Sequence, residues 1–349
     1  MKKFLSIILV IGILMSVMSI SVSAEAEVTT LTEKEKAMLT ISRADIDKDG
    51  TYSTNDAAKL LRAAAGIELA NEEYDIDLDG SVTLLDAQKM LKVSAGIEPL
   101  IEDNALLLAI FDENLDSVKQ TKPGFTRTVT MVCPSVKVTT TGAPTGFSDL
   151  NVSNMEYKDY VNKFVSLMNT FPYNTMLDAE MKAELEEMKK SAVEIYKPQI
   201  ETKTIAAASN SHYTYFPVNN LGWSCNLTLE DIKAISQTMV DGKIKITVTM
   251  GDYTYSKGQY PSAFSEKQKL PYGKIFNLPN LPNDGSTINS VALKNGVIVL
   301  AVDAVTGSVA AVDYSYSYNT DITAAKSEGS TLTMRTVTTA NTNENYVMN

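Results

Sequence analysis

Apolar and polar residues alternate along several stretches in the second half of the chain. Every second residue from Ile244 to Met250 is apolar, and this stretch follows Asp241-Gly242, a typical hairpin turn. The same pattern predicts a second hairpin that joins 297–302 to 309–318, and a last strand over 332–337. Alternation gathers the apolar side chains on one face, which is typical of antiparallel strands that cover a core.

Three stretches further upstream have the periodicity of helices instead. Apolar residues three and four positions apart predict helices over 104–119, 155–168 and 177–196. A strand that starts at Phe125 follows the first of them. Residues 103–349 are therefore expected to form an α+β domain, with helices packed on a curved antiparallel sheet.

The N-terminal third of the chain contains a tandem repeat. The stretch from Asp45 to Glu68 aligns with the stretch from Asp75 to Glu98 after a shift of 30 residues. Each copy opens with an acidic loop and continues as a short helix that ends at Gly66 or Gly96. The stretch 67–74 between the copies is too short for a full helix, so each copy is predicted to be a loop followed by one helix.

The acidic loops have the spacing of an EF-hand calcium loop. Asp occupies loop positions 1, 3, 5 and 12, and glycine occupies position 6, where the loop turns sharply. Position 7 would supply a backbone carbonyl and position 9 a hydroxyl or a bridging water, which completes the oxygen set that calcium prefers. The predicted ligands of two Ca²⁺ ions are Asp45, Asp47, Asp49, Thr51, Ser53 and Asp56 in the first loop, and Asp75, Asp77, Asp79, Ser81, Thr83 and Asp86 in the second.

The stretch from about residue 40 to about residue 100 resembles a type I dockerin module. The resemblance rests on the two loop-helix repeats, on the Asp at position 12 followed by Ala, and on the Gly-Ile-Glu that closes each copy. Dockerins are small, all-α, calcium-binding modules that dock onto cohesin modules of scaffold proteins in cellulosomes and related complexes of anaerobic Gram-positive bacteria. The resemblance therefore implies a cohesin-bearing scaffold as the partner, and we assign the dockerin-like module to residues 25–102.

The resemblance also indicates which residues would contact the partner. In dockerins these contacts come from loop positions 10 and 11 and from the helix that follows. The corresponding residues are polar in the first copy and partly apolar in the second, which favours one preferred binding orientation. They are Thr54, Asn55 and Arg62 in the first copy, and Leu84, Leu85 and Lys92 in the second. An alternative for the two leucines is that they close the small core between the helices.

Residues 1–24 are typical of a secretory signal peptide. Lys2 and Lys3 precede an apolar stretch, and small residues at Val22 and Ala24 allow cleavage before Glu25. No later stretch is long and apolar enough to span a membrane. We therefore expect a secreted protein that is extracellular or held at the cell surface through a scaffold.

The charge of the chain narrows the class of partner. The formal net charge is −11, and residues 25–102 carry 17 acidic against 8 basic residues. We do not expect nucleic acids or anionic membranes as partners, because binding them requires clustered Lys and Arg. A metal ion or a cationic partner suits this charge better.

Residues 103–349 offer little sign of catalysis. His212 is the only histidine in the chain, and no hydrolase, metalloprotease, dinucleotide or P-loop motif is present. We therefore leave the catalytic residues unknown and favour a non-catalytic binding or structural domain. Two alternatives stay open, namely a scaffold-associated carbohydrate-active enzyme such as a glycoside hydrolase, which would act on a polysaccharide, and a carrier of a lipid or peptide.

Tyrosines and cysteines add two weaker signals. Tyrosines recur with period two at 213 and 215, at 253 and 255, and from 314 to 318, so each group shares one face of its strand. Such a stripe can stack on sugar rings or line a cavity, but it more often packs in a core.

Cys133 and Cys225 are candidates for one disulfide in an oxidising compartment. The stretch from Phe216 to the turn at 302–307 weakly resembles an uncharacterised secreted domain of Gram-positive anaerobes, which implies no activity.

Overall fold

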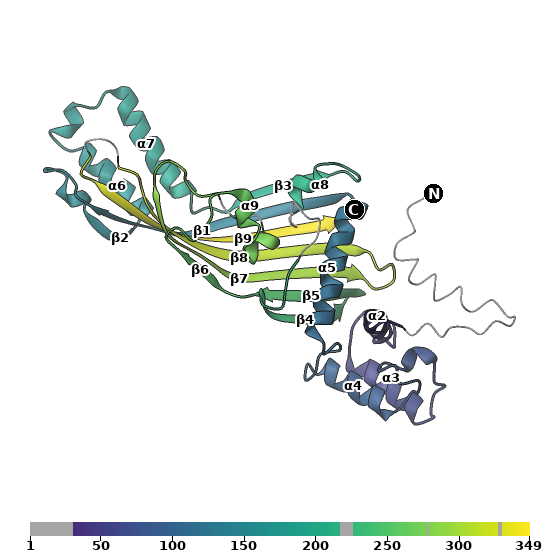
Figure 1. Ribbon diagram of the computed structural model, residues 1–349. Helices are drawn as coiled ribbons and strands as arrows, with labels where there is room; N and C mark the ends of the chain where they lie inside the picture. Colours follow the sequence, from purple (N-terminus) through teal and green to yellow (C-terminus); the bar gives the residue numbers. More distant parts are fainter. Residues whose placement is uncertain (1–30, 217–225, 277, 279, 327–329) are drawn as a thin grey trace.

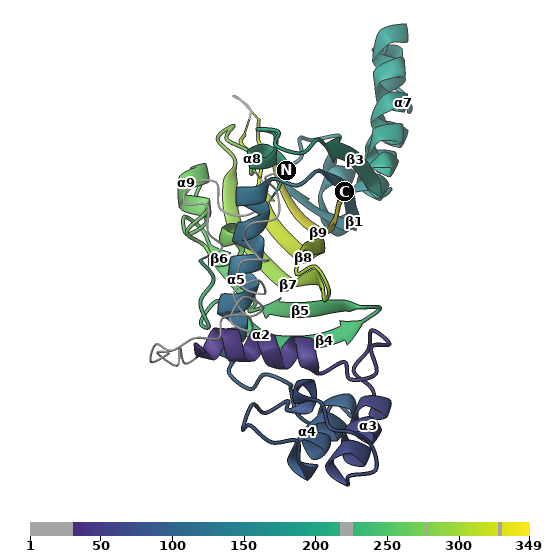
Figure 2. The same ribbon diagram turned by 90° about the vertical axis from the view of Figure 1, so that its right-hand side faces the viewer.

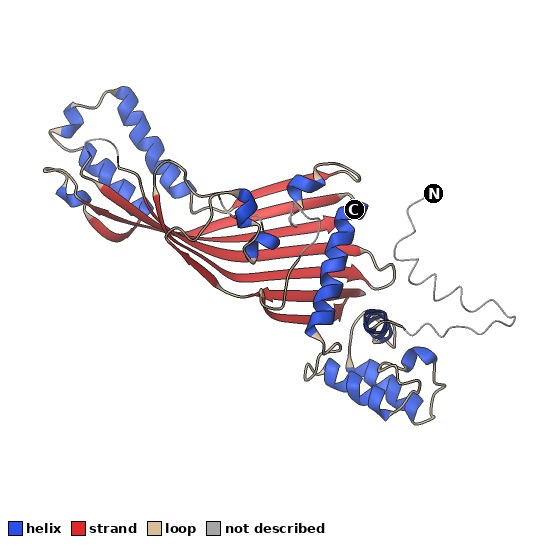
Figure 3. Cartoon of the chain, viewed as in Figure 1, coloured by secondary structure: helices blue, strands red, loops and turns tan. Residues whose placement is uncertain are grey.

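The protein consists of a helical N-terminal region followed by a long sheet with helices packed on it (Figure 1, Figure 3). The computed structural model describes residues 31–216, 226–276, 278, 280–326 and 330–349. The predicted architecture, small helical repeats followed by an α+β region with an antiparallel sheet, is confirmed. The expected signal peptide lies outside the described residues. None of the helices in the described ranges has the length and apolar content that a membrane crossing requires.

Each loop of the repeat leads into a helix through the same cap. The N-terminal elements are α2 (Glu33–Arg43), α3 (Thr54–Ala64), the short 3-10 helix η2 (Glu72–Tyr74) and α4 (Leu84–Ser94). Ser53 and Asp56 form a capping box at the start of α3, and Thr83 and Asp86 form the same box at α4. Helices α3 and α4 pack on each other, with Leu60 and Met90 fully buried between the repeats.

In the described part of the chain, nine strands form one antiparallel sheet. They are β1 (Phe125–Thr141), β2 (Val152–Glu156), β3 (Gln199–Ile205), β4 (Ile232–Val240), β5 (Lys243–Met250), β6 (Tyr253–Ser256), β7 (Thr287–Asp303), β8 (Val309–Thr323) and β9 (Thr333–Met348). The main order is β2-β1-β9-β8-β7-β5-β4, while β3 also pairs with β1 and β6 with β7. The long strands β1, β7, β8 and β9 therefore run the length of the sheet, and shorter strands share its two edges.

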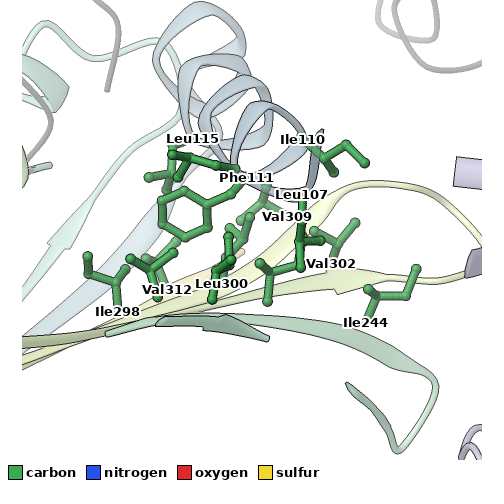
Figure 4. Close-up of a cluster of buried hydrophobic side chains, with 14 of the residues drawn as sticks. Leu107, Ile110, Phe111, Leu115, Ile244, Ile298, Leu300, Val302, Val309 and Val312 are labelled. Atoms are coloured by element: carbon green, nitrogen blue, oxygen red, sulfur yellow. The ribbon is translucent and has the colours of Figure 1, made fainter. Parts of the chain in front are cut away.

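Helix α5 (Asn104–Thr121) crosses one face of the sheet at the end nearest the repeats (Figure 2). Its side chains Leu107, Phe111 and Leu115 are buried against the sheet. Figure 4 shows them pointing toward apolar side chains of β7 and β8, among them Ile298, Leu300, Val302, Val309 and Val312. This cluster continues into the repeat region through residues such as Ile41 and Ile46, so repeats and sheet share one core.

A second cluster covers the far end of the sheet. Helices α6 (Tyr157–Met168) and α7 (Ala179–Glu194) pack there over the end of β1, with Val138, Val161 and Leu185 buried. A bulge in β1 between Val132 and Ser135 explains why both clusters lie on one face, because it moves the inward side chains of β1 from odd to even positions. The remaining short helices are η3 (Ser148–Leu150), η4 (Tyr173–Thr175), α8 (His212–Tyr215), α9 (Phe264–Lys267) and η5 (Tyr272–Lys274).

Several boundaries differ from the predicted ones, and β7 in particular begins at Thr287, ten residues before the predicted start at 297. The helix expected from 155 begins at Tyr157, because the residues just before it form the edge strand β2. The last strand extends to Met348 rather than ending at 337. Every residue of β9 from Thr333 to Met348 pairs with β8, with β1 or with both. Its polar Thr and Asn residues weaken the alternating pattern, which hides the length of the strand from sequence analysis.

Candidate metal centre

Three aspartates of each loop converge on one point. In the first loop, carboxylate oxygens of Asp45, Asp47 and Asp56 all lie within 4.8 Å of one another, and Asp75, Asp77 and Asp86 form the matching triad in the second loop. These are loop positions 1, 3 and 12. Each triad can hold a metal ion.

The backbone of the two loops is nearly the same. Position 4, which is Lys48 or Leu78, has a φ of 61° or 60°, and position 6, Gly50 or Gly80, has a φ of 87° or 93°. Two left-handed residues so close together make a tight turn that brings positions 1, 3 and 12 together. The sharp turn predicted from the glycine is present in both copies.

Position 12 ties each loop to the helix that follows. Asp56 is fully buried, and its Oδ1 accepts hydrogen bonds from the backbone N–H of Ile46 at 2.8 Å and of Asp47 at 3.1 Å. Its Oδ2 accepts from the N–H of Ser53 at 2.7 Å. Asp86 makes the same three bonds in the second loop, at 2.9, 3.3 and 2.8 Å. One carboxylate therefore closes the loop and caps the helix in each repeat.

Position 5 is not part of either triad. Asp49 and Asp79, the predicted ligands at this position, each accept a hydrogen bond from the N–H two residues further on, at 2.9 Å from Thr51 and at 2.8 Å from Ser81. The two residues at position 9, Ser53 and Thr83, are the N-cap residues of α3 and α4. The structure thus brings together three of the six predicted ligands of each loop and keeps the other three beside them in the same turn.

Asp45 provides the clearest sign that the first loop needs a cation. The residue is 6% exposed, and its Oδ1 is buried with no hydrogen-bond partner among the described residues, although Oδ2 accepts from Gly50 N–H at 3.1 Å. A buried carboxylate oxygen without a partner is costly unless a cation binds it. Burial, together with the charges of the neighbouring aspartates, raises the pKa of Asp45. The donor set of hard carboxylate oxygens fits a hard dication such as calcium.

The predicted partner contacts all lie at the surface or close to it. Leu84 and Leu85 are each 59% exposed, and Thr54 and Asn55 are exposed at the start of α3. The leucines therefore do not close the core between the helices, which was the alternative. Arg62 and Lys92 occupy matching places, and each forms an ion pair 2.6 Å long, Arg62 with Glu68 and Lys92 with Glu98.

The first loop also contacts the sheet, which the sequence did not indicate. The N–H of Gly242, in the turn between β4 and β5, donates to the carbonyl of Gly50 at 2.9 Å. The Gln237 side chain donates to the Tyr52 hydroxyl at 3.1 Å, and that hydroxyl donates to the Ile41 carbonyl at 2.8 Å. The sequence around these turns and around Tyr52 does not indicate a contact with a residue 185 positions away in the chain.

The other residues singled out from the sequence have structural surroundings. Tyr314 and Tyr316 are buried in the core of the sheet face, while Tyr253, Tyr255 and Tyr318 are partly buried beside it. Cys133 is half-buried in the bulge of β1, and Cys225 lies outside the described residues, so the disulfide stays a prediction. The His212 side chain and Trp223 also lie outside the described part.

Comparison of the chain with family models, with curated proteins and with solved structures finds no match in any of the three.

Proposed function

We propose that residues 25–102 bind two calcium ions and dock the protein onto a cohesin module of an extracellular scaffold, with the sheet region as a non-catalytic binding or structural cargo. The observation that carries this proposal is the position of Leu84 and Leu85. Two adjacent, exposed leucines lie between Thr83 and Asp86, at the junction of the second acidic loop and α4.

This position links docking to calcium. Leu84 and Leu85 belong to the first turn of α4, which Asp86 caps while it also joins the second triad. A metal ion held by that triad would fix the start of α4 and with it the two leucines. Complete burial of one exposed leucine stabilises a complex by about 1.5–3 kcal/mol at most. Two adjacent leucines can therefore act as an anchor for the partner.

The proposal includes one preferred orientation of the partner. The matching surface of the first copy is polar, with Thr54 and Asn55 in place of the leucines. The first loop is in addition held against the β4–β5 turn through Gly50 and Gly242. At the first two positions of the helix after each loop, the second copy therefore offers an apolar anchor where the first copy offers polar side chains.

Titration calorimetry of the mature chain, residues 25–349, tests both parts. We expect two calcium ions per chain in buffer stripped of metal, and tight binding to at least one member of a cohesin panel that EDTA abolishes. The double variant Leu84→Ala/Leu85→Ala should bind that cohesin about 100-fold more weakly, and Thr54→Ala/Asn55→Ala less than about 10-fold more weakly.

Val193→Ala is the matched control, because Val193 is an exposed apolar residue on α7, which packs over the far end of the sheet. Its cohesin affinity should stay unchanged. Calcium binding without any cohesin partner would overturn the docking part and leave the metal part standing.

A further inference from the structure

A cavity lies on the face of the sheet that carries the helices. It is located between the part of the sheet covered by α5 and the part covered by α6 and α7. Its volume is about 420 Å³. It is lined by β3, β1, β9 and β8, at the stretch of each strand nearest the bulge in β1. Ligand sites commonly have a size of about 300–1,000 Å³, so the cavity can hold one or two small rings.

The strand register sets the floor of the cavity. Arg127 on β1 pairs with Tyr346 on β9, Val129 with Glu344, and Met131 with Thr342. Tyr316 on β8 lies opposite Thr342 on the other side of β9. Because paired residues point to the same face, these side chains form one surface with apolar and polar parts next to each other.

A charged pair is buried in this floor. Arg127 donates to Glu344 Oε2 from Nε at 3.1 Å and from Nη2 at 2.9 Å. The Tyr346 hydroxyl lies 2.6 Å from the same oxygen. Glu344 is only 6% exposed, yet within the described residues all hydrogen bonds of its side chain are made by Oε2. Oε1 can therefore accept from a ligand, while Arg127 Nη1 can donate to one.

The remaining lining determines which ligand chemistry fits. Two carboxylates, Glu201 and Glu344, stand against the single guanidinium of Arg127, so the lining has a net charge of −1 and disfavours phosphates, fatty acids and acidic sugars. A purely apolar ligand would bury the charged pair without giving it hydrogen bonds, which is unfavourable. Thr342 and Tyr318 add hydroxyls, and Gln199 adds an amide oxygen that can accept while its Nε2 donates to the carbonyls of Glu194 and Lys197.

We propose that this cavity binds a neutral sugar ring, with the hydroxyls on Arg127, Glu344 and Gln199 and the apolar face of the ring against Tyr318 and Met131. A sugar hydroxyl donates and accepts at once, and therefore satisfies a carboxylate and a guanidinium that lie side by side. The C–H face of the same ring suits the tyrosine and methionine. This site lies in the sheet region and does not depend on the proposed scaffold docking.

Ligand-observed NMR and calorimetry on the mature chain with calcium test the proposal. The probes are glucose, xylose, galactose and cellobiose, with glucuronate, decanoate and leucine as the acidic, apolar and zwitterionic comparisons. We expect at least one neutral sugar to bind with a Kd below about 10 mM, and glucuronate to bind at least about 10-fold more weakly than glucose.

Variants locate the binding. Tyr318→Ala should weaken sugar binding about 10-fold or more, and the pair Gln199→Ala/Glu201→Ala, at the exposed edge strand, should do the same without disturbing the fold. Thr202→Ala is the matched control, because Thr202 lies on the same strand but contacts Thr128 on the opposite face. If Tyr318→Ala unfolds, the edge pair alone decides.

Three outcomes would overturn the proposal. The first is that no neutral sugar binds below about 10 mM. The second is that the sugar binds equally well to the edge-pair variant. The third is that only decanoate or only leucine binds, which would identify an apolar carrier site or an amino-acid site instead.

Discussion

The two acidic loops have the same local structure but different surroundings. Both place carboxylate oxygens of three aspartates within 4.8 Å of one another, and in both position 12 completes the capping box of the following helix. Gly50 of the first loop is buried against the turn between β4 and β5, whereas Gly80 of the second loop is exposed. Local sequence thus determines how each loop is built, and the surrounding fold determines which of them can pass the effect of a bound metal to the sheet.

The largest effect is expected when both triads are removed. In Asp45→Ala/Asp75→Ala, neither loop keeps the carboxylate at position 1, so the stabilisation that we propose for calcium should be lost. A site filled at about 1,000 times its Kd stabilises the folded state by about 4 kcal/mol, and two such sites exceed what a module this small can spare. We expect α3 and α4 to unfold while the sheet region keeps a thermal transition of its own.

Circular dichroism and calorimetry of the mature chain measure this outcome. The helical signal should fall in the variant, and EDTA should produce the same loss in the wild type. An unchanged spectrum and a single unchanged melting transition would show that the loops fold without metal.

The single variants separate the two loops. Asp45→Ala and Asp75→Ala should each reduce the calcium stoichiometry from two to one. Only Asp45→Ala should also loosen the contact with the sheet, because Asp45 Oδ2 accepts from Gly50 N–H and Gly50 accepts from Gly242. Hydrogen exchange of the Gly242 amide is the direct measurement, and it should accelerate about 10-fold or more in Asp45→Ala, which corresponds to a local loss of about 1.4 kcal/mol.

The same amide should exchange at the wild-type rate in Asp75→Ala. Equal acceleration in both variants would mean that the loops act as one unit and that the contact at Gly50 has no special role.

A pair of glycine variants isolates the contact itself. Alanine at Gly50 or Gly80 would adopt a left-handed backbone in either case, with a strain of about 1–3 kcal/mol. The added Cβ at Gly50 would lie 2.5 Å from the Gly242 nitrogen, whereas at Gly80 it would meet nothing within 4 Å. Gly50→Ala should therefore weaken calcium binding and also release the β4–β5 turn, while Gly80→Ala should only weaken calcium binding.

Melting temperatures and Gly242 exchange distinguish the two variants. We expect Gly50→Ala to melt several degrees lower than Gly80→Ala, since about 1 kcal/mol shifts the melting temperature of a small domain by about 4–8 °C. Identical behaviour of the two variants would count against a structural role for this contact.

The features that the sequence predicted are those that local pattern controls. The triads at Asp45 and Asp75 and the strands around Ile244 follow from spacing, glycine position and alternation. The contact of Gly50 with Gly242 and the burial of Glu344 beside Arg127 arise only when distant strands and loops come together, and nothing in the neighbouring residues signals them. Asp49 is an intermediate case. The pattern correctly placed it in the acidic loop, but it did not predict that its carboxylate accepts a hydrogen bond from Thr51.

The smallest expected effect concerns the Tyr52 hydroxyl, which supports the first loop and has no counterpart in the second, where Val82 occupies the same position. Tyr52→Phe removes the acceptor for Gln237 and the donor to the Ile41 carbonyl. Losing two partly buried hydrogen bonds of this kind should lower the free energy of unfolding by about 1–2 kcal/mol. Denaturant unfolding in saturating calcium measures this loss.

Tyr74→Phe is the control, because the Tyr74 hydroxyl makes no hydrogen bond within the described residues. The unfolding midpoint of this variant should equal that of the wild type. A stability loss as large in Tyr74→Phe would mean that the contact with Gln237 does not distinguish the first repeat from the second.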